Sequence, residues 1–164
     1  NPEFDVAERV TALLSGYRRA FCMRSVHHRG SADDPGLVLA LDETPGASCE
    51  GLALRAAPGS EAETLRALRA RELISSAYRE CLLPLDLIDG RRVTALAYVV
   101  QREHVQYCGG LSLEEQARII ARARGGRGPN ADYLFNTHAH LAELGVEDAE
   151  LDWLEDRVRA LLDG

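Results

Sequence analysis

The sequence contains no lysine, and all 19 of its basic residues are arginine. A codon bias of the source genome explains this absence better than any functional requirement does. Long apolar runs are missing too, and none approaches the roughly 18 residues of a membrane-spanning helix, so we expect no transmembrane helix. The formal net charge of -7 leaves no excess of positive charge. Because nucleic-acid binding depends on clustered cations that displace counterions, we expect no nucleic-acid partner.

Closely spaced cysteines are also missing. Cys22, Cys49, Cys81 and Cys108 are widely separated, and no Cys-X-X-Cys pair occurs. This excludes the usual patterns of a zinc site and of a disulfide scaffold, and we expect reduced thiols in a cytoplasmic protein. The 164 residues, 46% of them hydrophobic, are enough for a single domain over residues 1–164 that forms a core without such links.

The first half of the chain is rich in short apolar segments. Residues 5–14 carry apolar side chains with the period of a helix, whereas residues 17–26 look extended. Residues 37–41 form the continuous apolar run that is typical of a buried strand. A turn is expected at Thr44-Pro45-Gly46, followed by another strand over residues 49–57.

The strongest turn signal in the chain is Asp89-Gly90. It joins two strand-like runs, residues 81–88 and 92–100, and predicts a β-hairpin. Because Pro84 has no amide hydrogen to donate, the first of these strands is expected at a sheet edge or with a bulge.

The last third of the chain has the period of helices. Ser112 and Glu115 predict a capping box at the start of the first helix. Asn130 is expected to cap a second helix that ends at Gly145, and Asp148 is expected to begin a third. Strands followed by helices, without alternation of the two, predict an α+β domain.

A carboxylate lies where the helix predicted before the hairpin calls for an apolar side chain. At about 100° per residue, Leu65, Leu68 and Glu72 fall within one narrow arc. A carboxylate at the edge of a core must be paired or must shift its pKa, because desolvation disfavours the ionised form. Glu72 is therefore a candidate general base. In the alternative interpretation the helix frays there, and Glu72 pairs with Arg69 or Arg71 at the surface.

Histidine and glycine motifs elsewhere carry less weight. His138 and His140 are two residues apart on a predicted helix, so their side chains point in different directions and we expect no metal site. His27-His28 would point to opposite faces of a strand. The glycines of residues 124–129 are not followed by Lys-Ser/Thr, which favours a turn between helices over a phosphate loop.

A series of short patches covers nearly the whole chain. They are Arg18-Arg19-Ala20-Phe21, Ser25-Val26-His27-His28-Arg29-Gly30, Pro35-Gly36-Leu37-Val38-Leu39, Glu50-Gly51-Leu52-Ala53-Leu54-Arg55, Arg71-Glu72 with Tyr78, Leu96-Ala97-Tyr98-Val99, Tyr107-Cys108-Gly109, Ala117 with Ile120, Gly128-Pro129-Asn130 and Asp132-Tyr133-Leu134. In this order and spacing they resemble the ChaC-type γ-glutamylcyclotransferases, enzymes that degrade glutathione.

The resemblance implies a γ-glutamylcyclotransferase-like fold, a small mixed β-barrel with helices packed outside it and a helical C-terminal third. It assigns Glu72 as the catalytic general acid/base. It also implies a strand in part of residues 5–14, and we adopt the strand because periodicity over ten residues is weak evidence. The implied reaction is the cyclisation of glutathione to 5-oxoproline with release of Cys-Gly, which requires no metal and no cofactor.

Four further residues at family-matched positions are candidates for substrate binding: Ser25, Arg29, Tyr78 and Tyr107. Arg29 could bind a substrate carboxylate through two hydrogen bonds, or it could pin the turn at Asp33-Asp34. Each tyrosine could orient the substrate, or it could be half-buried with its hydroxyl in water. The alternatives to glutathione cyclisation are the same reaction on other γ-glutamyl amines or peptides, and a catalytically silent binding domain.

The stretch Asn1-Pro2-Glu3-Phe4 matches one that, in the family, follows a strand and a Tyr-Gly-Ser-Leu loop whose backbone amides hold the γ-glutamyl group. The sequence begins just after the position of that loop. Either the intact protein has these residues upstream, which we expect, or it lacks them. A barrel deprived of that strand would expose apolar surface and unpaired edges.

Overall fold

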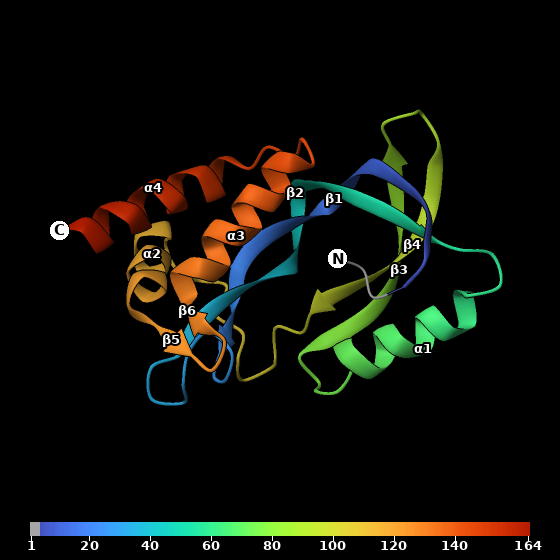
Figure 1. Ribbon diagram of the computed structural model, residues 1–164. Coiled ribbons are helices and arrows are strands. Elements are labelled where there is room, and N and C mark those ends of the chain that lie inside the picture. Colours follow the sequence, from blue (N-terminus) through green and yellow to red (C-terminus); the bar gives the residue numbers. More distant parts are fainter. Residues whose placement is uncertain (1–3) are drawn as a thin grey trace. The chain divides into compact units, whose positions relative to one another are not determined.

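The computed structural model describes residues 4–164, so Asn1-Pro2-Glu3 of the N-terminal stretch lies outside the described residues. Figure 1 shows its strands and helices. In chain order they are β1 Val6–Ser25, β2 Gly36–Ala56, α1 Glu61–Glu72, β3 Tyr78–Leu87, β4 Arg92–Val100, α2 Leu113–Arg122, β5 Arg124–Gly125, β6 Gly128–Pro129, α3 Asn130–Glu143 and α4 Ala149–Asp163. The α+β class and the helical last third agree with the prediction. No helix in the described part of the chain is both long and apolar enough to span a bilayer.

The chain divides into two compact units. The first contains the chain up to Arg18 together with Leu41–His104, and the second contains Arg19–Ala40 together with Val105–Gly164. The first unit therefore holds α1, β3 and β4, whereas the second holds the elements from α2 to α4. The long strands β1 and β2 supply residues to both.

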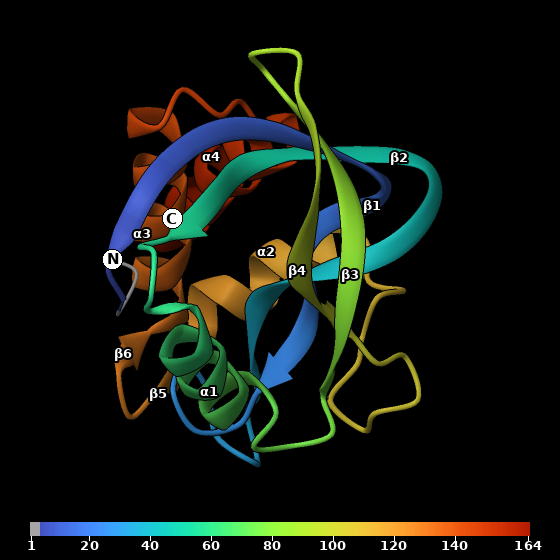
Figure 2. The same cartoon turned by 90° about the vertical axis from the view of Figure 1, so that its right-hand side faces the viewer.

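The four longer strands form a closed barrel in the order β1-β2-β4-β3. β3 and β4 form a long antiparallel hairpin, which is visible in Figure 2, with a register that runs from Tyr78 opposite Val100 to Asp86 opposite Arg92. β1 pairs with β3 in antiparallel fashion, whereas β2 pairs with β4 in parallel fashion. Both pairing directions thus occur in one barrel, as predicted.

The helix that the period of residues 5–14 suggested is wrong, because this segment belongs to β1. Ala12 and Leu14 are buried, whereas Leu13 between them is 40% exposed. This alternation is that of a strand with one face turned inward. The strand implied by the family resemblance is confirmed.

Two other expectations for the barrel strands are wrong. Thr44-Pro45-Gly46 does not end a strand, because β2 continues through it. Gly46 has φ +83°, a conformation in which glycine lets a strand change direction without ending. Pro84 marks neither an edge nor a bulge, since β3 pairs with β1 as well as β4 and the β3–β4 register passes through Pro84 opposite Thr94 without interruption.

The other turn and helix signals are confirmed, except the cap predicted at Asn130. Asp89-Gly90 lies in the loop between β3 and β4. Ser112 and Glu115 form the capping box of α2, in which each side chain accepts from the backbone of the other residue. Asp148 caps α4, and α3 ends shortly before Gly145, which has φ +72°. The glycine-rich segment before α3 forms the short β5–β6 hairpin, which is a turn between helices.

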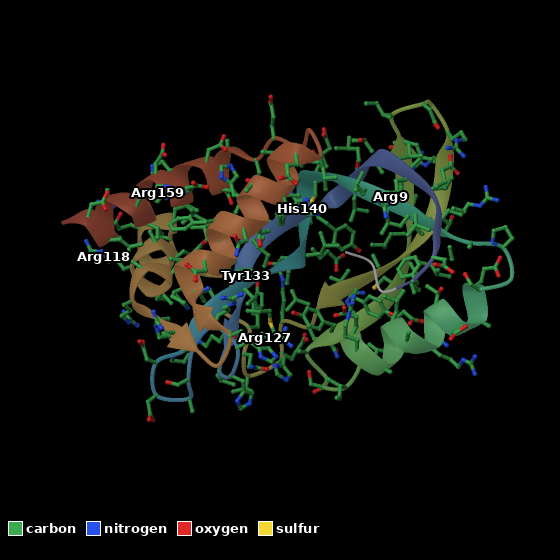
Figure 3. All side chains as sticks on the ribbon, viewed as in Figure 1. Arg9, Arg118, Arg127, Tyr133, His140 and Arg159 are labelled. Atoms are coloured by element: carbon green, nitrogen blue, oxygen red, sulfur yellow. The ribbon has the colours of Figure 1, made fainter. Side chains whose placement is uncertain are left out.

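In the second unit, α2, α3 and α4 pack with the parts of β1 and β2 that belong to it. The core contains large buried side chains from all five elements: Phe21, Leu37, Ile120, Leu134, Leu154 and Val158. The guanidinium of Arg159 on α4, a residue labelled in Figure 3, lies 4.1 Å from the ring centroid of Phe135 on α3. A cation–π contact therefore adds to this packing.

Asn130 is not the helix cap that the sequence suggested, because α3 begins at this residue and its side chain is fully buried. The Asn130 Oδ1 accepts a hydrogen bond from the backbone N–H of Leu37 at 2.7 Å, and Nδ2 donates to the Leu37 carbonyl at 2.8 Å. Buried backbone groups must be hydrogen-bonded. One side chain of α3 thus satisfies both backbone groups of a β2 residue.

Candidate active site

The predicted site residues belong to both units, and each group is described within its own unit. Glu72 and Tyr78 lie in the first unit, whereas Ser25, Arg29 and Tyr107 lie in the second.

Glu72 is the last residue of α1. It is partly buried, as are Leu65 and Leu68, whereas the intervening Arg69 and Arg71 are exposed, so the face predicted from the sequence is confirmed. The Arg71 Nε donates to the Glu72 Oε1 at 2.8 Å, which is one of the two pairings that the alternative interpretation named. The Glu72 side chain keeps 25% of its surface exposed. A carboxylate held through one oxygen and open to solvent is suited to proton transfer.

A second ion pair lies in the same turn of α1. Arg69 donates two hydrogen bonds to Glu80 on β3, from Nε to Oε2 at 2.9 Å and from Nη2 to Oε1 at 2.7 Å. The Tyr98 hydroxyl on β4 donates to the same carboxylate at 3.1 Å. Glu80 and Tyr98 are direct partners in the β3–β4 register, so their side chains share one face of the hairpin.

These contacts shift two pKa values in opposite directions. The hydrogen bonds from Arg69 lower the pKa of Glu80, and this effect outweighs the opposing cost of desolvation. Burial raises the pKa of Tyr98, and the hydrogen bond to Glu80 raises it further. The negative charge of Glu72 adds to that rise, so Glu72 lies close enough to Tyr98 to influence it.

Tyr78 is the first residue of β3 and follows the segment of residues 73–77 that leads out of α1 (Figure 1). It is half-buried. Side chains two residues apart on a strand share a face, so Tyr78 lies on the same face of the hairpin as Glu80.

In the second unit, Ser25 and Arg29 hold backbone together. The buried Ser25 hydroxyl accepts from the Arg29 N–H at 3.0 Å. The Arg29 Nη1 donates to the carbonyls of Arg127 at 2.8 Å and Pro129 at 3.1 Å, and its guanidinium lies 5.8 Å from the Tyr133 ring centroid. Arg127 and Tyr133 are labelled in Figure 3.

Arg29 therefore binds the β5–β6 hairpin, and the alternative in which it pins the turn at Asp33-Asp34 is wrong. Asp34 instead accepts from the Arg122 Nε at 2.9 Å. The backbone beside Arg29 is tightly packed as well, since a Cβ on Gly30 would lie 1.9 Å from the Gly36 nitrogen. Only glycine fits that position.

Tyr107 forms an isolated antiparallel bridge with Met23. A Cβ on Gly109 would lie 2.0 Å from the Tyr107 hydroxyl oxygen, so this hydroxyl packs directly against the glycine. The side chain of Tyr107 is half-buried.

His138 and His140 take different partners. His138 binds Asp152 through Nε2 at 2.6 Å and Glu155 through Nδ1, and both carboxylates lie on α4. His140 lies 3.7 Å from Glu143 on its own helix. The His138 ring thus joins α3 to α4.

We expect His138 to make the stability of the protein depend on pH. The hydrogen bond to Glu155, aided by that to Asp152, raises the pKa of His138 above its ordinary value of 6.5. A raised folded-state pKa stabilises the fold below the unfolded-state pKa, and the stabilisation is lost as pH rises through the folded-state pKa. The melting temperature of wild type should therefore exceed that of His138→Gln near about pH 5.5 and approach it by about pH 9.

Thermal unfolding across this pH range checks the expectation, with His140→Gln as the matched control on the same helix. The control should follow wild type at every pH. A constant difference between wild type and His138→Gln would contradict the proposed linkage.

Sequence reasoning missed the pairing of Arg69 with Glu80 and Tyr98. Tyr98 did lie in a family-matched patch, and Arg69 was named with Arg71 as one of two possible partners of Glu72, of which Arg71 is the one observed. No signal pointed to Glu80, because its place opposite Tyr98 depends on the hairpin register. The two hydrogen bonds between the Asn130 side chain and the Leu37 backbone were missed as well, although both residues fall in family-matched patches.

Comparison with known proteins supplies the family context. A model of the ChaC-like protein family matches residues 1–161. The glutathione-specific gamma-glutamylcyclotransferase of Escherichia coli is 37% identical over 162 residues, which cover 99% of this chain and 69% of that protein. Gamma-glutamylcyclotransferase 2-3 of Arabidopsis thaliana is 30% identical, with coverage of 97% and 83%. A crystal structure of a γ-glutamyl cyclotransferase specific to glutathione from yeast has the same fold, with a TM-score of 0.83, 20% identity and coverage of 97% and 90%.

Proposed function

Because this chain belongs to the ChaC-like family, we propose that it is a γ-glutamylcyclotransferase that converts glutathione to 5-oxoproline and Cys-Gly. The observation that carries the proposal is the similarity, over almost the whole chain, to an Escherichia coli protein whose name specifies glutathione.

The reaction is a ring closure within the substrate. The α-amine of the glutamyl group attacks its own γ-carbonyl, so a new C–N bond closes a five-membered lactam. The C–N bond to cysteine then breaks, and the cysteine nitrogen leaves with a proton. Because the attack is intramolecular, holding the glutamyl chain folded supplies part of the rate enhancement. Atoms balance without water, an oxidant or a cofactor.

Glu72 would act as the base and then as the acid. An α-amine has a pKa of about 7.7–8.0 and is mostly protonated at neutral pH, so it must lose a proton before it attacks. The Glu72 carboxylate would take that proton and return it to the departing cysteine nitrogen. The hydrogen bond from Arg71 reaches Oε1, which leaves Oε2 facing the substrate amine in this proposal.

The other predicted residues have more limited roles. Tyr78 shares the hairpin face of the Glu80–Tyr98 pair and would orient the substrate within the first unit. In the second unit, both hydrogen bonds of the Arg29 side chain use Nη1, so Nε and Nη2 would bind a substrate carboxylate. Ser25 would fix the backbone of Arg29. Tyr107 would orient the substrate through its hydroxyl.

A panel of substrates tests this proposal on the full-length protein. Glutathione, γ-glutamylcysteine and other γ-glutamyl amino acids are incubated separately, and 5-oxoproline and the released amine are quantified by chromatography. We expect equal amounts of 5-oxoproline and Cys-Gly from glutathione, with unchanged rates in the presence of a chelator. Faster turnover of another γ-glutamyl compound would favour the broader cyclotransferase. Intact glutathione after long incubation with folded protein would favour a silent binding domain.

A further inference from the structure

The last turn of α1, which carries Glu72, is attached to the β3–β4 hairpin by a defined network. Arg69 lies one helical turn before Glu72 and binds both oxygens of Glu80. The Tyr98 hydroxyl binds the same carboxylate from the neighbouring strand. We call Arg69, Glu80 and Tyr98 the α1 clamp.

We propose that the α1 clamp is a positioning network that holds the last turn of α1, and with it Glu72, in the orientation that proton transfer requires. This inference rests on the proposed function, because it assumes that Glu72 exchanges a proton with substrate.

The geometry supports a positioning role for two reasons. The end of a helix lacks partners for its last carbonyl groups and frays unless something holds it, and Glu72 is the final residue of α1. A bidentate arginine–carboxylate pair fixes both distance and orientation, so the clamp defines where this turn lies on β3. The β3–β4 ladder continues on both sides of Glu80 and Tyr98, which makes it a stable base for the clamp.

The charges of the clamp are paired with one another. Arg69 on α1 balances the negative charge of Glu80 on β3, and the Tyr98 hydroxyl on β4 donates to the same carboxylate. Glu72 has its own partner, Arg71, in the same turn of the helix. The pKa of Tyr98 is raised, so the hydroxyl stays protonated and continues to donate to Glu80.

Truncation of the clamp should lower kcat more than it changes KM. We expect kcat of Glu80→Ala to fall by about 10-fold or more, because even a small displacement of a catalytic group slows the chemical step. KM should change by less than about threefold. Tyr98→Phe loses only the hydroxyl and should show a smaller fall in kcat.

Arg79→Gln is the matched control. Arg79 lies next to Glu80 on β3 and donates to a different carboxylate, that of Glu43, at 2.7 Å. Its side chain is 44% exposed, which is similar to the 51% of Arg69. Its kcat and KM should equal those of wild type. The charge-swapped double variant Arg69→Glu with Glu80→Arg should recover activity that Arg69→Glu alone loses, because the ion pair forms again.

The outcomes separate this inference from the proposed function. An inactive wild type would overturn the proposed function and this inference with it. An active wild type whose Glu80→Ala and Tyr98→Phe variants keep full kcat would overturn the clamp alone. If Glu80→Ala does not fold, Tyr98→Phe and the charge-swapped pair decide the question. Wild-type kcat in both Tyr98→Phe and Arg69→Glu would contradict the proposal.

Discussion

Glu72→Gln is expected to lower kcat by about 10²–10⁴-fold, which is the usual contribution of a general acid or base. Glutamine keeps the size of the side chain and still accepts a hydrogen bond from Arg71, but it does not take up the proton of the substrate amine. Substrate affinity should change little, because the variant removes proton transfer and preserves the shape of the site. Steady-state release of 5-oxoproline from glutathione measures the effect.

The fold should survive this substitution. The Arg71–Glu72 pair is largely at the surface, with 53% of the arginine side chain exposed, and such pairs contribute at most about 1 kcal/mol. Glu63→Gln, an exposed glutamate in the first turn of the same helix, is the matched control and should retain wild-type kcat. Retention of wild-type kcat by Glu72→Gln would show that another group is the base.

Asn130→Ala is expected to lower the free energy of unfolding by about 2–6 kcal/mol, because it leaves two buried backbone groups of Leu37 without partners at about 1–3 kcal/mol each. Asn130 is 0% exposed and binds both of those groups. Asn130→Asp keeps the size of the side chain but would bury a carboxylate with one oxygen against the Leu37 carbonyl, so we expect a loss at least as large. Denaturant unfolding followed by circular dichroism measures both variants.

The control for this experiment is Asn136→Ala, an exposed asparagine on the same helix. Its free energy of unfolding should stay within about 0.5 kcal/mol of wild type. If Asn130→Ala lowered the free energy of unfolding no more than Asn136→Ala does, the hydrogen bonds from Asn130 to Leu37 would not be a major source of stability.

The elements of the fold follow largely from local signals, and the errors have physical causes. The capping box at Ser112 and the turn at Asp89-Gly90 act through neighbouring residues, so they were predicted correctly. Thr44-Pro45-Gly46 has the composition of a turn, yet β2 continues through it. Gly46 adopts a positive φ there, as a glycine in a turn would, but inside a continuous strand. Asn130 has the chemistry of a helix cap, but its partners lie on β2, far away in the sequence. Tertiary contacts decide between such uses, and composition does not show them.

In the candidate site, too, local features could be predicted from the sequence and tertiary contacts could not. The position of Glu72 on a half-buried helix face is a local property and could be predicted. The α1 clamp depends on the hairpin register. A two-residue loop at Asp89-Gly90 would place Glu80 opposite Val99, whereas the N–H of Leu87 donates to the Arg91 carbonyl at 2.8 Å across a longer loop. This shift of one residue brings Glu80 and Tyr98 to the same face.

The most direct test of the central claim is the fate of glutathione in water enriched in ¹⁸O, incubated with the full-length protein. Ring closure by the substrate's own amine uses no water, so mass spectrometry should find unlabelled 5-oxoproline together with an equal amount of Cys-Gly. Glutamate that carries ¹⁸O in its γ-carboxylate would instead reveal hydrolysis by water and would contradict the account.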